Sequence, residues 1–548
     1  MRIRTPATVA SLRARNTYTL MNKPQKRKTT VVDYQSNQKQ FIVDSLEKLK
    51  QDNFSDPEKI LAYARFLRGM SFEAVLALEL ADYLPDSDYS DKNRKGALGN
   101  LLEEHYFGYT ANSDSSPDFA AAGMELKLSP VEYGNNRKKQ RVIKAGERLV
   151  LSMIPNNRKI PLEYEGSTLE KKASDILLIN YLRDRSVKNT EQVIKFVNRY
   201  QISGEDLEII KADYEKIVRM IQAGRAHELS EGMTNYLGAC TKGATAEKSL
   251  RAQFYPLIHE DGSLEYKPAK SRAFSLKQSF MTSLVQRFER EELEADRLIQ
   301  DSHQLHENSF DDIVLQIFLP YEGKYELELA QEKAPDLNPG AKNFYNALTW
   351  RLLGSRKERI EEFEKAGISV HAIRVQKNGK IKEKIKLKNF KFADLHAETS
   401  WEDSEWYSLL SDKRYLFVVY QEDDNHDYYL RGAFFWAVPA HLIGSEEFEN
   451  KTGTAYEYWL DTKQKLRNGV EVVYEGGTYK NNFLKASENP VCHIRPSAQQ
   501  AAYRFTDDRP DVGNVERDAD QLPDGQWMTK QAFWLNSELI RVSIEKHI

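Results

Sequence analysis

Two acidic residues and a lysine stand close together in the stretch SPDFAAAGMELKLSPV, residues 116–131. Glu125 and Lys127 alternate with apolar residues, and this period of two is typical of a β-strand that carries both side chains on one face. Asp118 precedes them, and a turn at Gly123 would bring its carboxylate to the same point. Two such carboxylates can hold a hard divalent cation, while the lysine orients an attacking water or stabilises charge developing on a phosphate.

The solvated face of an edge strand is the usual alternative explanation for such a pattern. The preceding stretch GALGNLLEEHYFGY favours a site, because its apolar residues recur at helical spacing and place Glu103 one turn after Gly99. A carboxylate on a helix beside the strand would be a third contributor to a metal site. The order Asp, then Glu-x-Lys, is typical of metal-dependent nucleases.

Two sequence motifs, KGALGNLLE at 95–103 and PDFAAAGMELK at 117–127, match the motifs of one protein family in order and spacing. Here the chain resembles the MutH superfamily, which holds the mismatch-repair nicking endonuclease MutH and related GATC-cutting type II restriction endonucleases. The resemblance implies that Asp118, Glu125 and Lys127 are catalytic and that Glu103 is the helix carboxylate. It also implies Mg²⁺ as cofactor, with Asp118, Glu125 and Glu103 as its ligands.

The fold implied is α/β and restriction-endonuclease-like, a mixed sheet flanked by helices. The apolar runs ERLVLSMI, 147–154, and DILLINYL, 175–182, predict buried strands that we expect to join the catalytic strand in one sheet.

Two later words, HELSEGMTNYLGACTKGA at 227–244 and RAFSLKQSFMTSLVQRF at 272–288, also resemble the MutH family. The resemblance places the loop that reads GATC in the major groove at Thr241, Lys242 and Gly243, and a DNA-binding lysine at Lys277. The family's Arg-Pro pair is absent from this loop. Taken alone, Lys242 would be a solvent-exposed turn lysine; inside a matched word, contact with a base or phosphate is favoured.

The chain then repeats itself at an offset of about 250 residues, which indicates a duplicated domain. KNFYNALTWRLLG, EEFEKAGISVHAIRV, HIRPSAQQ and WMTKQAFWLNSELI echo the words of the first half in order. The second copy lacks the metal ligands: Glu362 stands for Asp118, Ser369 for Glu125, His371 for Lys127 and Trp350 for Glu103. Serine and histidine cannot replace the carboxylate and amine of a magnesium site.

The second copy keeps the motifs whose residues are expected to contact DNA. Arg495 and Pro496 fall in its recognition loop, Lys530 is aligned with Lys277, and arginine is the best bidentate reader of guanine. We therefore interpret this half as a degenerate nuclease that binds DNA without cutting it.

The composition describes an ordinary globular chain of 548 residues, 40% hydrophobic and 29% charged, with a formal net charge of -3. No apolar run reaches the length of a membrane span, and the two cysteines favour the reducing cytoplasm. The expected domains are a basic, disordered extension at 1–36, a catalytic MutH-like domain at 37–287, a charged linker and hinge at 288–312, and a degenerate MutH-like domain at 313–548.

One active and one inert copy resemble the two-domain type IIE restriction endonucleases, in which a second bound site activates cleavage. The resemblance implies double-strand cleavage of DNA at GATC and a cognate DNA methyltransferase for the same sites, and it leaves dimerisation on DNA and sensitivity to methylation open. The alternatives are a MutH-like mismatch-repair nickase, which the duplicated domain disfavours, and a non-catalytic DNA-binding regulator, which the complete Asp118, Glu125 and Lys127 set disfavours.

Overall fold

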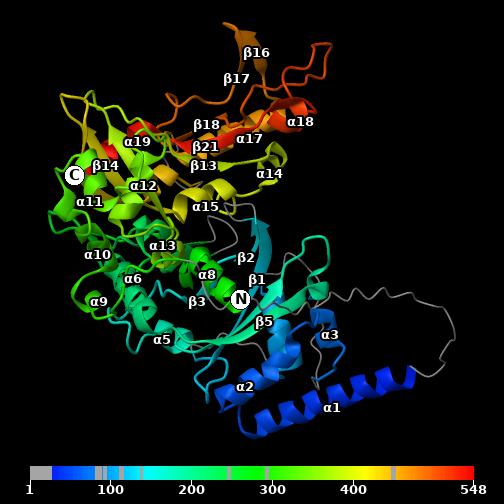
Figure 1. Ribbon diagram of the computed structural model, residues 1–548. Coiled ribbons are helices and arrows are strands. Elements are labelled where there is room, and N and C mark those ends of the chain that lie inside the picture. The colour runs from blue at the N-terminus through cyan, green and yellow to red at the C-terminus, as the bar shows by residue number, and fades with distance from the viewer. Residues whose placement is uncertain are drawn as a thin grey trace, which may run out of the picture.

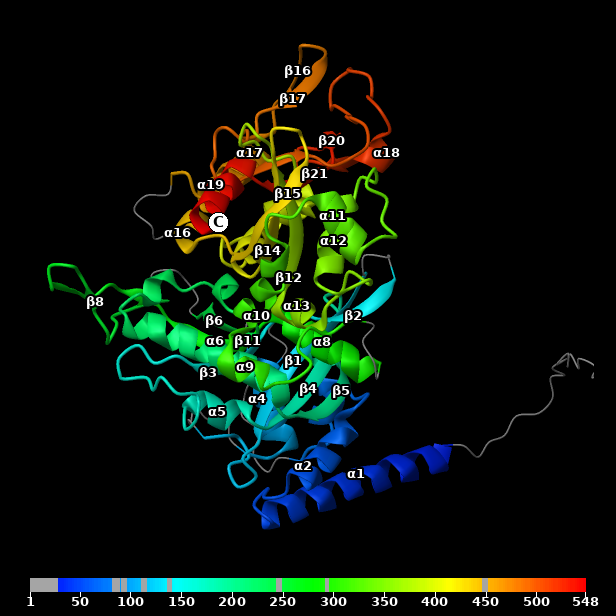
Figure 2. The same cartoon turned by 60° about the vertical axis from the view of Figure 1, so that its left-hand side comes forward.

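The structure is a computed structural model that describes residues 28–80, 89, 96–109, 116–135, 140–242, 249–290, 295–445 and 452–548, without the side chains of 28–38. Two α/β halves are stacked, with the N-terminal half at the bottom of Figure 1 and the C-terminal half at the top. Figure 2 shows the same stacking from another side. Within the described ranges, no helix is long and apolar enough to cross a membrane.

The first sheet of the N-terminal half has the strand order β2-β1-β4-β5. β1 runs parallel to β4, while β2 and β5 are antiparallel to their neighbours. The strands are β1 (Glu125–Asn135), β2 (Arg141–Ala145), β4 (Ile176–Leu182) and β5 (Val193–Tyr200). Leu177 packs on the N-terminal helices and Leu178 on the opposite layer, so β4 is mostly apolar because both of its faces are buried.

The N-terminal helices cover one face of this sheet. They are α1 (Lys28–Gln51), α2 (Pro57–Ala64), α3 (Phe72–Leu76) and α4 (Ala97–Leu101), followed by a π-helical turn, η2 (Leu102–Tyr106). A core of buried apolar residues joins them to Leu126 of β1.

A second sheet of the first half has the order β3-β11-β6, with β11 antiparallel to both neighbours. It comprises β3 (Leu149–Met153), β6 (Leu237–Thr241) and β11 (Arg272–Leu276), and it packs with α5 (Thr168–Ala173), α6 (Gly204–Gln222) and α8 (Gln278–Glu289). Short ribbons β7 (Leu250–Arg251), β8 (Leu257–Ile258), β9 (Leu264–Glu265) and β10 (Ala269–Lys270) lie between β6 and β11. The expectation that residues 149–153 join the catalytic strand was wrong, since β3 pairs with β11.

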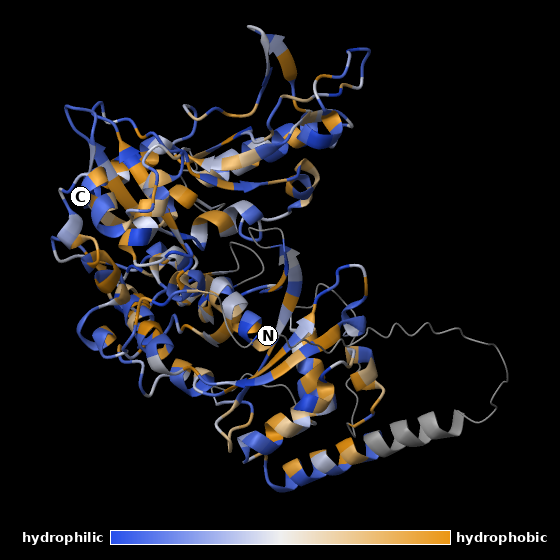
Figure 3. Ribbon diagram, viewed as in Figure 1, coloured by the Kyte–Doolittle hydropathy of each residue, from blue (hydrophilic) through white to orange (hydrophobic). Residues whose placement is uncertain are grey.

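The C-terminal half repeats both sheets. β12 (Ile368–Val375) is parallel to β14 (Arg414–Glu422), which is antiparallel to β15 (Tyr428–Trp436), as β1, β4 and β5 are arranged. Likewise β21 (Gln531–Leu535) lies between β13 (Lys386–Asn389) and β18 (Cys492–Pro496), as β11 lies between β3 and β6. Figure 3 colours the apolar centre of β14 orange, in keeping with its burial. The fold is therefore a duplicated, restriction-endonuclease-like α/β fold.

The other elements of this half surround these sheets. The helices are α11 (Glu326–Lys333), α12 (Phe344–Leu352), α13 (Glu361–Ala366), α14 (Phe392–Ala397), α15 (Glu405–Ser411), α16 (Ala440–Ile443), α17 (Ala455–Asn468), α18 (Val515–Asp518) and α19 (Ser537–His547). Two short hairpins complete it, β16 (Val472–Glu475) with β17 (Thr478–Asn481), and β19 (Ala519–Gln521) with β20 (Trp527–Thr529).

The described part of residues 288–312, which the sequence predicts to be a charged linker and hinge, packs against both halves. It holds α9 (Gln304–Glu307) and the start of α10 (Phe310–Gln316) rather than one helix. Ile299 and Phe310 are buried in a core that takes apolar residues from both halves. The segment thus joins the halves through a common interior.

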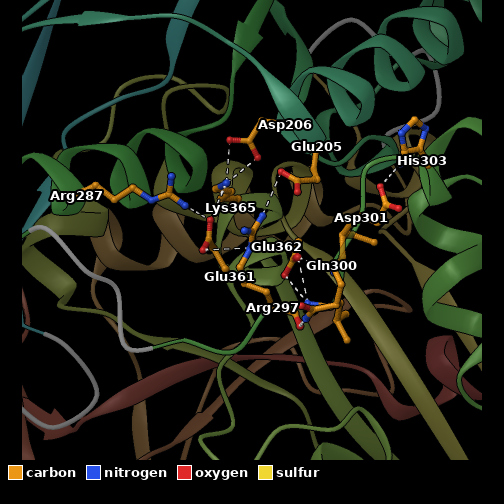
Figure 4. Close-up of polar contacts among 12 residues, drawn as sticks. Glu205, Asp206, Arg287, Arg297, Gln300, Asp301, His303, Glu361, Glu362 and Lys365 are labelled. Carbon is orange, nitrogen blue, oxygen red and sulfur yellow. Dashed lines mark hydrogen bonds and ion pairs between the residues drawn. The ribbon is translucent and has the colours of Figure 1, made fainter.

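A buried ion cluster crosses the same interface, as Figure 4 shows. Lys365 of α13 is 6% exposed, and its Nζ lies 2.6 Å from Asp206 Oδ1 of α6 and 2.8 Å from Glu361 Oε1. Arg287 of α8 pairs with the same Glu361. Opposite charges from both halves therefore neutralise one another around the buried ammonium of Lys365.

Candidate active site and DNA-contacting residues

Asp118 is fixed at the start of the catalytic strand by a tight turn. The backbone of Phe119 pairs with Met124, and Gly123 closes the turn with φ 65°, a left-handed conformation that favours glycine. The chain therefore folds back as the sequence predicted, and Asp118 Oδ2 accepts a hydrogen bond from the Leu126 N–H at 2.8 Å.

Glu125 lies on the inner face of β1 and is 1% exposed. Its Oε1 accepts from Lys127 Nζ at 2.6 Å and from Lys172 Nζ of α5 at 3.4 Å. Its Oε2 is buried and has no hydrogen-bond partner among the described residues. A buried carboxylate oxygen without a partner is costly, so this atom suits a ligand to a divalent cation.

Glu103 belongs to the π-helical turn η2, a wide turn that is frequent at functional sites. Burial raises the pKa of Glu103 to about 7, and the negative charge of Asp118 raises it further while Lys127 opposes the shift. Burial, and then the charge of Glu125, also raises the pKa of Asp118. The three carboxylates are thus close enough to repel one another.

A cation would relieve that repulsion. In the part of the chain that the structure describes, no three Asp, Glu, His or Cys side chains are already gathered as a metal cage. The donor set nevertheless fits magnesium, because Glu103, Asp118 and Glu125 offer oxygen ligands and one of these oxygens has no other partner.

Two residues of this site were missed by the sequence reasoning. Lys172 comes 47 residues after Glu125, and only the packing of α5 brings it near. The Tyr109 hydroxyl is buried without a hydrogen-bond partner among the described residues. Burial and then the charges of Asp118, Glu103 and Glu125 raise the pKa of Tyr109. No periodic pattern in the sequence marks either residue.

The corresponding region of the second half cannot hold the same metal. Gly367, with φ 68°, takes the place of Gly123, so Ser369 and His371 occupy the positions of Glu125 and Lys127. Glu362 is 3% exposed and accepts hydrogen bonds from the N–H groups of Leu298 and Ile299. Its carboxylate serves the interface between the halves, and Trp350 is buried in the common core.

Comparisons with known proteins agree with this geometry. The family model described as the DNA mismatch repair enzyme MutH matches residues 107–213. The type II restriction enzyme Sau3AI of Staphylococcus aureus is 34% identical over 484 residues, which cover 83% of this chain and 94% of that enzyme. The chain belongs to the family of MutH-like type II restriction enzymes. As a member of that family it is a restriction endonuclease, a site-specific deoxyribonuclease.

MutH proteins match only part of the chain. The DNA mismatch repair protein MutH of Vibrio cholerae serotype O1 is 27% identical over 233 residues, covering 42% of this chain and 96% of that protein. MutH of Vibrio campbellii is 27% identical over 239 residues, covering 43% of this chain and 96% of that protein. A complete MutH protein thus corresponds to less than half of this restriction enzyme.

The predicted recognition loop begins where β6 ends. Thr241 is the last residue of β6 and is paired with Arg272, and the Lys242 N–H donates to the Ser271 carbonyl at 2.7 Å. Lys242 is half-buried, and Gly243 lies outside the described residues. DNA contact by these three residues stays a prediction.

Lys277 occupies an interior position that does not support the predicted DNA contact. It is 3% exposed and its ammonium donates to the Thr234 carbonyl. Burial lowers the pKa of Lys277 to about 7, although the nearby Asp213 opposes the shift. We interpret Lys277 as a residue that holds the segment before β6 in place.

The second half confirms this interpretation through its backbone register. Lys277 precedes α8 directly after β11, and Asn536 precedes α19 directly after β21, so Asn536 is the counterpart of Lys277. Asn536 also donates its side-chain N–H to an internal carbonyl, that of Asn489. The sequence alignment of Lys530 with Lys277 was therefore wrong.

Lys530 instead corresponds to Ser271. The Ser497 N–H donates to the Lys530 carbonyl as the Lys242 N–H donates to that of Ser271. The Lys530 Nζ donates a hydrogen bond to the Arg517 carbonyl at 2.5 Å. Lys530 therefore lies beside the predicted recognition loop of the second half, where contact with DNA stays a prediction.

Arg495 and Pro496 end strand β18 as Thr241 ends β6. Arg495 is half-buried, with its guanidinium carbon 5.2 Å from the centre of the Trp534 ring, and Pro496 is exposed. Their DNA contacts stay predictions too.

Proposed function

We propose that this restriction enzyme cuts both strands of DNA at GATC with Mg²⁺ in its first half, while its second half binds another GATC site and activates cleavage. The observation that carries the catalytic part is Glu125, a buried carboxylate held by lysines on one oxygen and without a partner on the other. That arrangement is unfavourable without a cation and favourable with one.

Each residue of the site has a task that follows from its place. Asp118 is oriented by the Leu126 N–H, and Glu125 by Lys127 and Lys172, so both carboxylates are held for a metal ion. When bound, magnesium would act as a Lewis acid on the phosphate and make its water more acidic. Lys127 shares the strand face of Glu125, where its charge can stabilise negative charge that develops on the phosphate. Glu103, with a pKa of about 7, can exchange a proton with water near neutral pH.

The proposed effector role is supported by the repeated β-sheets and by the loss of the metal ligands from the second copy. Ser369 and His371 leave this copy without carboxylates on the strand, whereas the end of β18 keeps Arg495 beside Trp534. Because the halves share a core, DNA binding at the second half can change the conformation or the DNA affinity of the first half.

A plasmid digest tests the proposal. Plasmids that carry one or two GATC sites are incubated with the enzyme, with and without Mg²⁺, beside a plasmid in which every GATC is changed by one base. We expect linear product only with Mg²⁺ and GATC, and faster cutting with two sites. Cutting of the altered plasmid would refute GATC specificity, and equal rates for one and two sites would refute the effector role.

A MutH-like nickase is the second candidate, because MutH proteins match the catalytic half. The same digest separates the two, since a nickase would accumulate open circles without linear product. Plasmids methylated at adenine or at cytosine of GATC would identify the modification that protects a host, and so the kind of methyltransferase that accompanies the enzyme.

A further inference from the structure

A row of lysines lies along the extended segment that leads into strand β13 of the second half, and it has no place in the function proposed so far. The sequence GKIKEKIKLKNFK, residues 379–391, has a lysine at every second position from Lys380 to Lys388. All five of these lysines are exposed, and the residues between them are half-buried or buried. Lys380, Lys382, Lys384 and Lys386 therefore lie along one face of an extended segment that leads into β13, where the strand register shifts after Lys386.

The other face of this segment explains why the lysines point outward. Ile385 is buried in the core of the second half, and Ile381 and Leu387 pack against that core. Glu383 is the one acidic residue of the stretch, and its carboxylate is bound by Arg374 at 2.6 Å. The positive charge of the row is consequently not cancelled from within the segment.

Neighbouring strands add to the same surface. Lys386 pairs across the sheet with Trp534 of β21, which pairs in turn with His493 of β18, and such partners share a face. Lys386 Nζ lies 5.9 Å from the centre of the Trp534 ring, and Arg495 lies 5.2 Å from it. With strands spaced about 4.8 Å apart, the row stands roughly 10 Å from the strand that carries Arg495.

We propose that Lys380, Lys382, Lys384 and Lys386 bind the phosphate backbone of duplex DNA held by the second half. The inference rests on the proposed effector role and adds the surface that would carry its affinity. In an extended segment, lysines two residues apart are spaced about 6.7 Å, which gives a line of charges suited to a line of phosphates. Lys388 is left out because it pairs with Glu405.

The strand of the first half that corresponds to β13 has no such row. This strand, β3, which flanks β11 as β13 flanks β21, reads LVLSM and contains no lysine. The lysine row thus belongs to the copy that has lost its metal ligands. That copy needs to bind DNA tightly and does not need to release a cleaved product. The contact would be independent of sequence, because a phosphate carries no base information.

The test compares two full-length variants in a Glu125→Ala background, which removes cutting. One variant changes Lys380, Lys382, Lys384 and Lys386 to Gln; the control changes Lys333, Lys342, Lys357 and Lys546, four exposed lysines of the same half, to Gln. Titration with short duplexes counts the sites per chain and gives the dependence of each affinity on salt. Lysine acetylation followed by mass spectrometry, with and without duplex, reports which amines DNA protects.

Each lost phosphate contact should lower the slope of log K against log salt by about 0.9, so the row variant should lose about 3 to 4 from the slope of the second site. GATC and altered duplexes should weaken alike, the control should keep the parent slope, and DNA should protect the row from acetylation. If two duplexes bind but the row variant keeps the parent slope and its lysines stay unprotected, the row is not a DNA contact. If the parent chain binds only one duplex, the effector role itself fails.

Discussion

Proton release on metal binding gives a sharp test of Glu103. Its pKa of about 7 in the metal-free protein means that a cation must compete with a proton for this carboxylate. The ionised fraction rises from roughly 0.09 at pH 6 to roughly 0.91 at pH 8 for a group of that pKa, so the apparent affinity for Mg²⁺ should rise about 10-fold over this range. Replacing Glu103 by Gln should remove most of this dependence.

Calorimetric titration with Mg²⁺ at pH 6, 7 and 8, in two buffers of different ionisation heat, measures both the affinity and the protons released. Near pH 6 about one proton should leave per ion bound by the parent, and fewer by Glu103→Gln. Thermal unfolding gives a second readout. A carboxyl whose folded pKa is raised contributes stability at low pH that is lost as pH rises through the folded value, so Glu103→Gln should gain melting temperature relative to the parent at pH 8 but not at pH 4. An affinity for Mg²⁺ that is equal at pH 6 and 8 would refute the reasoning.

Three further predictions concern single residues. Glu125→Ala should abolish cleavage yet retain DNA binding, because a metal ligand is lost and no groove contact is; near-normal cleavage would remove Glu125 from the site. Arg495→Ala should lower discrimination between GATC and altered duplexes by about 1–3 kcal/mol if this arginine reads a base, whereas a uniform weakening in a binding assay would mean phosphate contact. Lys277→Met should leave the salt dependence of DNA binding unchanged but lower the melting temperature, because the Thr234 carbonyl loses its partner; a smaller salt slope would restore Lys277 as a DNA contact.

Local pattern was enough to find the catalytic strand and its turn. The alternation around Glu125, the turn at Gly123 and the helical spacing before Glu103 each follow from nearest neighbours, and the repeat fixed the duplicated fold. The lysine row was also visible as a period of two, but no motif drew attention to it.

Long-range packing decided what pattern could not. An interior lysine and a surface lysine look alike in sequence, so the sequence alone predicts DNA contact for the buried Lys277. The similar motifs around Lys277 and Lys530 also suggest an alignment that the backbone does not support, because Asn536 is the counterpart of Lys277. Lys172 meets Glu125 only because α5 packs beside β1. Strand β3 could not be assigned to a sheet because pairing depends on β11, far along the chain.

The interior common to both halves has a consequence for how the enzyme comes apart. Apolar side chains from 145 to 430 form one continuous core, and the buried Lys365 with its ion pairs lies beside it. Separating the halves would expose this apolar surface and leave buried charges without their partners. Neither half is therefore expected to fold stably by itself. Melting should accordingly appear as a single transition in calorimetry. The two copies of the domain would then unfold as a single cooperative unit. The second copy would be required for the stability of the first, because it covers apolar surface of the first half, in addition to any role in binding DNA.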